Sequence, residues 1–576
     1  MKNFYPIMLL FFFSVSSLSQ SWQWTKRGGA SDALTSNDGR EAVYAMVTDS
    51  FKNVYMLSKV GYYDLNIDGV PKQNWSSGSD YFKEDIVLAS FSCNGTYRWS
   101  KVIGGKSNES VRGMTIDAQN NIYIAGRFGD GNAAFPPRID NDIIIPQNPE
   151  DYSLTFLAKY DFNGNFQWLK RPQASTVSFT DGYSNTGTRG LATDYNGTLY
   201  WLVQLPVGVY ANGAFNCTTA GNYILKYNAA GAFLGAIPFD MQLTGAAGAN
   251  LKFYRNPISG NFFVICENAI SNSTTVLGGQ FITKSFYLAC FSPMGQLLWK
   301  RENTKNIGEG GIYPYGISFD ENSNIILAGA IFGWTNGDSF LGFTKTTPGR
   351  GSFVMKLNPT AETVLWSTNN NVNGIWQEGG VTYNPIKNEI GITALVHGTN
   401  VVWGTQSIAS TPIGLGLEVL FARFNPATGA CLGLHKISNN NNGFAANGTA
   451  VTFDASGDYL VGGGFNGTIY PTATTTVVDA GSQSDFFVAK FATQACSSLA
   501  TENFDKTELQ VYPNPTTGLI TIAVLDKTTF EIFDIAGKQL LKGVLSVSEN
   551  TIDMRAFERG VYFLKIAGVV KKVVKE

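Results

Sequence analysis

The sequence predicts an all-β protein, with a seven-bladed β-propeller followed by a small immunoglobulin-like antiparallel β-sandwich. A short phrase recurs seven times through the middle of the chain, and a separate run of alternating strands follows it. The composition agrees, because aromatic residues make up 13% of the chain, glycine occurs 62 times and charged residues make up only 15%. Sheets joined by tight turns have such a composition.

The recurring phrase reads FLAKYDFNGNFQW at 156–168 and YLACFSPMGQLLW at 287–299. Each copy predicts four strands: the opening of the phrase, the strand with the tryptophan, a strand that ends in Asp, and a strand such as NIYIAGRF at 121–128. Four short strands with Gly-rich turns make one propeller blade. The phrase position that usually holds Lys or Arg marks the period, at 90, 159, 226, 290, 356, 423 and 490.

The two ends of this array predict how the ring closes. Trp22-Gln23-Trp24 matches the second strand of a repeat, while residues 485–491 supply a first strand with nothing after it. Six complete units and one shared blade therefore make seven. We expect 486–491 to pair with the strand around 24–27, which removes exposed sheet edges.

The phrase, with the downstream pattern D-x-x-x-N-x-Y-I-A-G, resembles the bacterial seven-bladed β-propeller repeat family (SBBP) over about residues 22–492. That family is described by its fold, so the resemblance implies architecture and little chemistry. We place the propeller domain at 20–496.

The N-terminal segment predicts a signal peptide at 1–19. Lys2 supplies a positive start, residues 7–13 form an unbroken apolar run, and cleavage is expected between Ser19 and Gln20. The apolar run is too short to span a membrane, so we expect a mature chain that is not membrane-spanning. A net charge of −2 without basic clusters predicts no nucleic-acid partner.

The C-terminal segment predicts a second domain. Residues 497–508 are polar and charged and read as a linker. Alternating strands around Pro/Asn/Gly turns then predict a β-sandwich at 509–576.

Three motifs in this segment resemble the type A C-terminal sorting domain of type IX secretion cargo. The resemblance implies export through the periplasm and across the outer membrane of a Gram-negative bacterium, with the type IX secretion machinery as partner. It also implies that the domain is removed and the cargo is released or anchored at the cell surface. The motif residues are Tyr512, Pro513, Asn514, Pro515, Thr517 and Gly518, then Asp534, Gly537 and Lys538, then Gly560 and Tyr562.

The sequence assigns no catalytic, cofactor-binding or metal-binding residue. His397 and His435 have no metal-ligand spacing, and both are expected in blade strands. No G-x-S-x-G motif presents a serine nucleophile. Aspartates recur before the turn that follows the Asp-ending strand, and we expect them to cap that turn, with calcium binding there or at 438–442 as the alternative. These aspartates are Asp49, Asp117, Asp194, Asp320 and Asp454.

Tryptophans and cysteines give structural rather than chemical predictions. The repeated tryptophans are expected to pack between blades, whereas Trp75, Trp334, Trp376 and Trp403 are candidates for a binding face. The six cysteines are Cys93, Cys217, Cys266, Cys290, Cys431 and Cys496. We expect Cys266, on an outermost strand, and Cys290, on the innermost strand of the next blade, to remain unbonded. Cys496 is expected to bond with Cys431 or Cys93, with Cys431 preferred.

Together these patterns predict a secreted or cell-surface protein without enzymatic activity that binds an extracellular glycan or protein. A secreted hydrolase acting on polysaccharide or peptide is the alternative, and it would need Asp/Glu pairs that converge at one mouth of the ring. A structural component of the cell envelope is a third interpretation.

Overall fold

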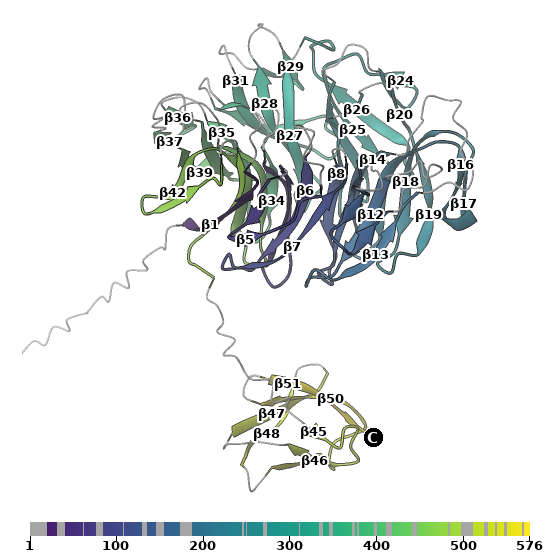
Figure 1. Cartoon of the computed structure of the whole chain (residues 1–576), viewed down its shortest axis with the longest axis vertical. Coiled ribbons are helices and arrows are strands. Elements are labelled where there is room, and N and C mark those ends of the chain that lie inside the picture. The colour runs from purple at the N-terminus through teal and green to yellow at the C-terminus, as the bar shows by residue number, and fades with distance from the viewer. Residues whose placement is uncertain are drawn as a thin grey trace, which may run out of the picture. The chain divides into compact units, whose positions relative to one another are not determined.

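The computed structural model divides into two compact units, Met1–Cys496 and Ser497–Glu576, and we describe each by itself. Strands dominate both units (Figure 1). The structure describes residues 20–31, 41–61, 63–75, 84–106, 109–129, 135–145, 155–172, 187–244, 247–248, 250–268, 274–309, 311–332, 338–344, 350–370, 375–376, 379–396, 400–409, 417–439, 446–481, 484–496, 511–522, 528–535, 538–546, 550–566 and 569–576.

The first unit is a seven-bladed β-propeller in which each blade is a four-stranded antiparallel sheet. The innermost strands follow one another around the axis, and β40 of the last blade lies against β2 of the first. From the inside outward, blade 1 has β2 (Val43–Thr48), β3 (Val54–Val60), β6 (Asp85–Phe91) and β7 (Tyr97–Gly104), and blade 2 has β8 (Ser110–Ile116), β9 (Ile122–Arg127), β12 (Thr155–Tyr160) and β13 (Phe166–Lys170). Blade 3 has β14 (Gly187–Thr193), β15 (Leu199–Leu205), β18 (Gly221–Tyr227) and β19 (Phe233–Phe239), and blade 4 has β21 (Lys252–Arg255), β22 (Phe262–Glu267), β25 (Phe286–Phe291) and β26 (Leu297–Glu302). Blade 5 has β27 (Ile312–Phe319), β28 (Ile325–Phe332), β31 (Arg350–Leu357) and β32 (Val364–Asn369), blade 6 has β34 (Val381–Asn384), β35 (Glu389–Val396), β38 (Glu418–Phe424) and β39 (Cys431–Asn439), and blade 7 has β40 (Asn447–Phe453), β41 (Tyr459–Phe465), β44 (Asp485–Ala492) and β1 (Ser21–Gly29).

The ring closes as predicted, because β1 pairs antiparallel with β44 from Ser21 opposite Ala492 to Gly28 opposite Phe486. The predicted order of strands within a blade is wrong, however. The Asp-ending strand is innermost, and the tryptophan strand is outermost. Consequently the shared blade takes three strands from the C-terminal side and one from the N-terminal side.

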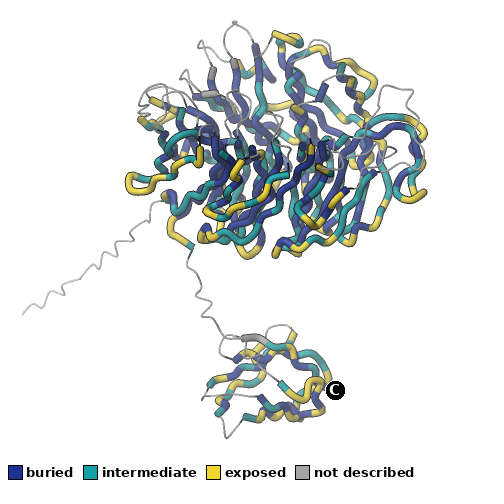
Figure 2. Tube along the Cα trace, viewed as in Figure 1, coloured by how far each residue is buried: buried dark blue, intermediate teal, exposed yellow. Residues whose placement is uncertain are grey.

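Burial explains this order. The second and third strands, such as β41 and β44, are buried along their whole length because both of their edges are paired and both faces are covered. The outermost strands are mostly part-buried, with exposed residues such as Leu298 and Leu365. The apolar cores lie between the sheets, as the buried segments show in Figure 2.

Outermost strands contact the following blade through their tryptophans. Trp99 Nε1 of blade 1 donates to Phe162 O of blade 2 (3.2 Å), and Trp168 Nε1 of blade 2 donates to Ala229 O of blade 3 (3.2 Å). Trp366 of blade 5 does the same to Pro426 O of blade 6 (3.0 Å). The prediction that the repeated tryptophans pack between blades is therefore confirmed for these positions.

The loop between the second and third strands of every blade carries an additional hairpin. In blade 2, this hairpin pairs with β7 of blade 1, and in blade 7 it pairs with β39 of blade 6. In blade 4, it pairs with β20 (Met241–Thr244), which follows the last strand of blade 3. The hairpins are β4 (Asn66–Ile67) with β5 (Val70–Pro71), β10 (Arg138–Ile139) with β11 (Ile143–Ile144), β16 (Gly208–Tyr210) with β17 (Phe215–Cys217), β23 (Thr274–Leu277) with β24 (Gln280–Phe281), β29 (Ser339–Phe340) with β30 (Phe343–Thr344), β36 (Asn400–Trp403) with β37 (Gln406–Ala409), and β42 (Thr468–Thr472) with β43 (Thr475–Val478). A 3₁₀ turn, η1 (Ala211–Gly213), joins β16 to β17, and β33 (Ile375–Trp376) pairs with β35.

The second unit is a two-sheet β-sandwich with its own core, as predicted. One sheet contains β45 (Val511–Tyr512), β46 (Leu519–Ile522) and β49 (Thr551–Asp553), and the other contains β48 (Gln539–Leu545), β47 (Thr528–Phe533), β50 (Gly560–Ile566) and β51 (Val569–Lys575). Ile520, Ile532 and Leu564 are among the side chains buried between the two sheets. The sandwich therefore has a core that is separate from the propeller.

Candidate functional site

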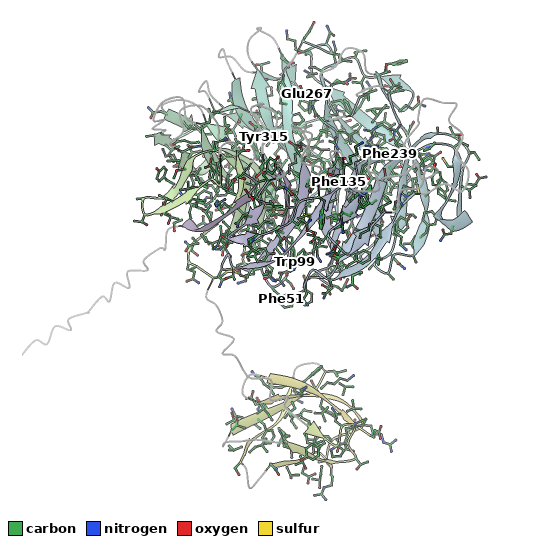
Figure 3. All side chains as sticks on the ribbon, viewed as in Figure 1. Phe51, Trp99, Phe135, Phe239, Glu267 and Tyr315 are labelled. Carbon is green, nitrogen blue, oxygen red and sulfur yellow. A yellow bond between two sulfur atoms is a disulfide. The ribbon has the colours of Figure 1, made fainter. Side chains whose placement is uncertain are left out.

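The two faces of the ring are built differently. One face carries the turns between the first and second strands, and these are only four to six residues long. The opposite face carries the hairpin loops, which range from 15 residues between Leu205 and Gly221 to 27 between Arg127 and Thr155. We call these the turn face and the hairpin face; Phe51 marks the former and Glu267 the latter in Figure 3.

The turn face is held together by the repeated aspartates. Asp117 Oδ1 accepts the backbone N–H groups of Gln119 and Asn121 (2.9 Å each), and its Oδ2 accepts the Tyr123 hydroxyl (2.7 Å). Asp49 and Asp194 accept tyrosine hydroxyls in the same way, from Tyr55 and Tyr200.

In blades 5 and 7, a lysine takes the place of the tyrosine. Lys356 Nζ lies 2.7 Å from Asp320 Oδ2, and Lys490 Nζ lies 2.6 Å from Asp454 Oδ2. These carboxylates cap their turns, as the sequence analysis expected. In each of these carboxylates, both oxygens accept hydrogen bonds from the chain. Of the Asn-rich stretch, residues 440–442 lie outside the described residues.

The hairpin face exposes large apolar side chains in most blades. Ile144, Phe281, Val402 and Val478 lie on the hairpins of blades 2, 4, 6 and 7 and are 41–66% exposed. Their identities differ from blade to blade, as do those of the exposed apolar residues on the turn face, Phe51, Ile258 and Ile386. Exposed apolar groups on varied loops above a rigid scaffold are typical of binding surfaces.

Nearer the axis, the hairpin face carries a polar cluster on blades 3 and 4. Arg189 Nη2 on β14 donates to Gln204 Oε1 on β15 (2.6 Å). Asn250 Nδ2 donates weakly to Glu267 Oε2 at the end of β22 (3.4 Å). Burial raises the pKa of the Glu267 carboxyl to about 7, so this group titrates near neutral pH.

Several buried carboxylates on this face hold its loops. Glu41 accepts the backbone N–H groups of Ala30 and Gly61, which follow β1 and β3. Asp485 forms an ion pair with Arg27. The carboxylates of Glu41 and Asp485 both face the Cα of Gly29, so the two acids lie close together where β1 ends.

The predictions for the histidines and loop tryptophans are confirmed at one position and wrong at another. His435 lies on blade strand β39, as expected; burial, followed by the nearby Arg423 charge, lowers its pKa to about 4, so it stays neutral. Trp403 was a candidate for the binding face, and this is wrong, because it is fully buried and donates to Thr368 Oγ1 (2.9 Å). Trp75 instead stacks with Arg138 (3.8 Å). His397, Trp334 and the Trp376 side chain lie outside the described residues.

The preferred cysteine pairing is also wrong. Cys496 bonds with Cys93, the other alternative, and Cys431 is a free thiol. Cys266 and Cys290 are unbonded, as predicted, but they lie on adjacent strands of the same blade rather than in two blades. Cys93, Asp454 and Cys496 form the one potential metal-ligand group in the described structure. Its sulfur atoms are joined and Lys490 Nζ lies 3.0–3.2 Å from them, which argues against a metal there.

The sorting motifs build the edges and turns of the sandwich. Asn514 bonds the last strand twice, donating to Lys572 O and accepting from Val574 N (2.8 Å each). Asp534 caps its turn by accepting Lys538 N (2.9 Å), and Tyr562 donates to Glu558 O (2.9 Å).

The other motif positions vary in their surroundings. Tyr512 is 53% exposed, and peptide bonds Tyr512–Pro513 and Asn514–Pro515 are cis. Thr517 lies in the turn that follows these two peptide bonds. The next residue is Gly518, where a Cβ would lie 2.3 Å from Arg555 Cγ. Gly560 is an ordinary strand residue, and a Cβ at this position would lie 3.9 Å from the Tyr562 ring. Gly537 and Ser19 lie outside the described residues, and Gln20 is the first described residue.

Comparison with known proteins agrees with the assignment of the second unit. Residues 510–576 match the secretion system C-terminal sorting domain family. The chain is therefore cargo of type IX secretion, and its sorting domain directs it to the cell surface or the medium. None of the described helices is long and apolar enough to cross a membrane.

The propeller has only distant relatives in these comparisons. An uncharacterised WD repeat-containing protein of Acanthamoeba polyphaga mimivirus is 24% identical over 231 residues, which cover 35% of this chain and 16% of that protein. The NanB sialidase of Streptococcus pneumoniae is 10% identical with a TM-score of 0.34, covering 75% of this chain and 66% of the other. A protein of unknown function from Dyadobacter fermentans is 10% identical with a TM-score of 0.32, covering 81% and 99%.

Proposed function

We propose that this protein is a non-enzymatic binding protein, whose hairpin face contacts an extracellular glycan or protein after export. The proposal rests on the contrast between the two faces. The turns of the turn face are four to six residues long and are capped by an Asp or Asn side chain, while the loops of the hairpin face vary from 15 to 27 residues. Variation above a constant scaffold is how loop-based binding surfaces are built.

Binding of the mature chain to glycan and protein arrays tests this proposal, with two matched triple variants. Ile144→Ser, Phe281→Ser and Val478→Ser remove hairpin-face side chains that are 50%, 66% and 55% exposed. Phe51→Ser, Ile258→Ser and Ile386→Ser remove turn-face side chains that are 62%, 59% and 54% exposed. We expect the first variant to weaken binding at least about tenfold and the second to leave it unchanged. Equal effects of the two variants, or no ligand on either array, would contradict the proposal.

One observation favours the hydrolase alternative enough to test it. Glu267 keeps its proton up to about pH 7, as a general acid does. Hydrolysis of any array ligand by the wild-type chain, and its loss in Glu267→Gln, would replace the binding proposal with an enzymatic one.

A further inference from the structure

The ring has one seam, where the N-terminal strand completes the last blade. Gln23 Nε2 on β1 donates to Ala492 O on β44 (2.9 Å), across 469 sequence positions. The other six blades are continuous in sequence, so a local turn holds each outermost strand to its neighbour. At the seam, β1 is held by pairing and packing without a connecting turn.

The disulfide spans this seam. Cys93 lies in the β6–β7 turn of blade 1, and Cys496 follows β44 of blade 7, with their Cα atoms 5.9 Å apart. The same turn receives Trp24 of β1, whose Nε1 donates to Cys93 O (2.9 Å). The bond therefore joins blade 7, through the residues after β44, to blade 1, over 403 residues of sequence.

Lys490 distinguishes this junction from the others. Lys159 and Lys356 hold the same position in blades 2 and 5 and donate to a turn carbonyl of the next blade, Ala229 O (2.9 Å) and Pro426 O (3.0 Å). Lys490 instead directs its Nζ at Cys496 Sγ (3.0 Å) and Cys93 Sγ (3.2 Å).

The surroundings of Lys490 fix this geometry. The side chains of Lys490 and Asp454 are 1% and 0% exposed, so the ion pair is buried, while both cysteines remain partly accessible. An ammonium group this close to two sulfur atoms stabilises their thiolate forms. The charged groups around the sulfurs are Lys490, Asp454 and Asp458, with Lys387 paired to Asp458.

We infer that Cys93, Cys496 and Lys490 form a redox-controlled lock on the ring, in which oxidation fastens blade 7 to blade 1 and reduction lets β1 separate. Lys490 is a positioning residue for this step, because it keeps the two thiols reactive at neutral pH.

The chemistry is thiol–disulfide exchange with an external disulfide, of a protein or of glutathione. One cysteine thiolate attacks that disulfide and expels one thiolate, which leaves a mixed disulfide on the ring. The second cysteine thiolate then attacks the ring sulfur of the mixed disulfide and expels the other half of the oxidant. The oxidant gains two electrons, and the two cysteine protons pass to solvent. The periplasm supplies such oxidants before the second membrane is crossed.

Hydrogen exchange of the mature chain tests the lock. The oxidised chain is compared with the chain reduced by dithiothreitol and with the Cys93→Ser, Cys496→Ser double variant. We expect the amides of β1 and β44 to exchange at least about tenfold faster in both open forms, while those of β12 and β13 in blade 2 stay unchanged. Unchanged exchange at the seam in the open forms would overturn the lock.

Oxidation kinetics test the role of Lys490. The reduced chain is mixed with glutathione disulfide between pH 6 and 9, and the rate of Cys93–Cys496 formation is followed by mass. Removing only the positive charge with Lys490→Met leaves the Asp454 carboxylate beside the two sulfurs, and it should slow oxidation at pH 7 about tenfold and shift the pH midpoint upward by about one unit. The matched variant Lys356→Met removes the equivalent lysine of blade 5, whose ion pair with Asp320 is remote from the disulfide, and it should leave the rate and the midpoint unchanged. An unchanged midpoint in the Lys490 variant would refute the positioning role, and so would an equal shift in both variants.

Discussion

The aspartate caps of the turn face make the stability of a blade depend on one buried hydroxyl. Asp117→Ala removes the acceptor for Gln119 N, Asn121 N and the Tyr123 hydroxyl. The two backbone groups lie in a surface turn and can bind water, whereas Tyr123 is 0% exposed. Loss of the cap costs about 1 kcal/mol, and the stranded hydroxyl about 2 kcal/mol more. We therefore expect Asp117→Ala to lower the free energy of unfolding by about 3 kcal/mol.

A double-mutant cycle isolates the hydroxyl. Tyr123→Phe alone should cost about 1 kcal/mol, and the double variant about 2 kcal/mol, because no hydroxyl is then stranded. The coupling energy is thus about 2 kcal/mol. Urea denaturation followed by tryptophan fluorescence measures all three values.

A control in the same blade separates capping from burial. Asp161 accepts hydrogen bonds from Asn163 N and Asn165 N at 2.9 Å each, just as Asp117 accepts two backbone N–H groups of its own turn. Asp161 differs because it accepts no buried hydroxyl. Asp161→Ala should therefore cost only about 1 kcal/mol. A coupling energy within about 0.5 kcal/mol of zero in the cycle would refute this reasoning. A calcium chelator is added to the wild-type chain as a further control. If chelation lowered the stability of the wild-type chain as much as Asp117→Ala does, the result would support calcium binding at this turn.

Three further predictions follow from the same contacts. Gly164→Ala should destabilise the ring by about 2 kcal/mol more than Gly197→Ala, by urea denaturation. Both glycines have positive φ (81° and 77°), but only at Gly164 would a Cβ lie 2.5 Å from the Trp99 ring. Glu267 has its pKa raised from 4.5 to about 7, so the native state keeps a proton that the unfolded chain releases. Stability should therefore fall by up to about 3 kcal/mol between pH 4.5 and 7, and Glu267→Gln should abolish that slope in a pH series of melts. Removing residues 509–576 should leave a protease-resistant propeller in the periplasm, and its appearance outside the host cells in normal amounts would contradict the sorting assignment.

The repeat could be predicted because its period is carried by side chains that pack in every blade. The phrase position at 159 and 356, for example, marks a lysine that reaches the next turn in both blades. The number of blades and the pairing of β1 with β44 follow from that period alone.

The grouping of strands into blades could not be predicted from the same signal. A period shows how often a unit recurs and does not show where one sheet ends. The missed signal was burial, because the continuous apolar runs of β41 and β44 mark strands with a neighbour on each edge. The choice of Trp403 as an exposed candidate failed for a related reason, because a tryptophan in a loop-like sequence proved to be part of the core.

The disulfide error has the same origin. Contacts on the turn face run forward around the ring, since Trp99 and Trp168 each donate to the turn of the following blade. Cys496 ends blade 7, so its forward neighbour is blade 1 and Cys93, whereas Cys431 lies one blade behind. The direction of these contacts follows from the strand order, which the sequence analysis had wrong.

The junction between blades 1 and 2 is sealed from two directions. On the turn face, outermost strands contact the following blade, and on the hairpin face, loops reach back to the preceding blade, as β10 does to β7. At the seam both contacts recur, through Trp24 to Cys93 and through β4 to β1. The seam lacks a connecting turn between the third and fourth strands of blade 7. The association of β1 with β44 therefore depends on pairing between residues far apart in the sequence. A covalent bond at this one junction supplies the constraint that chain connectivity gives the other six.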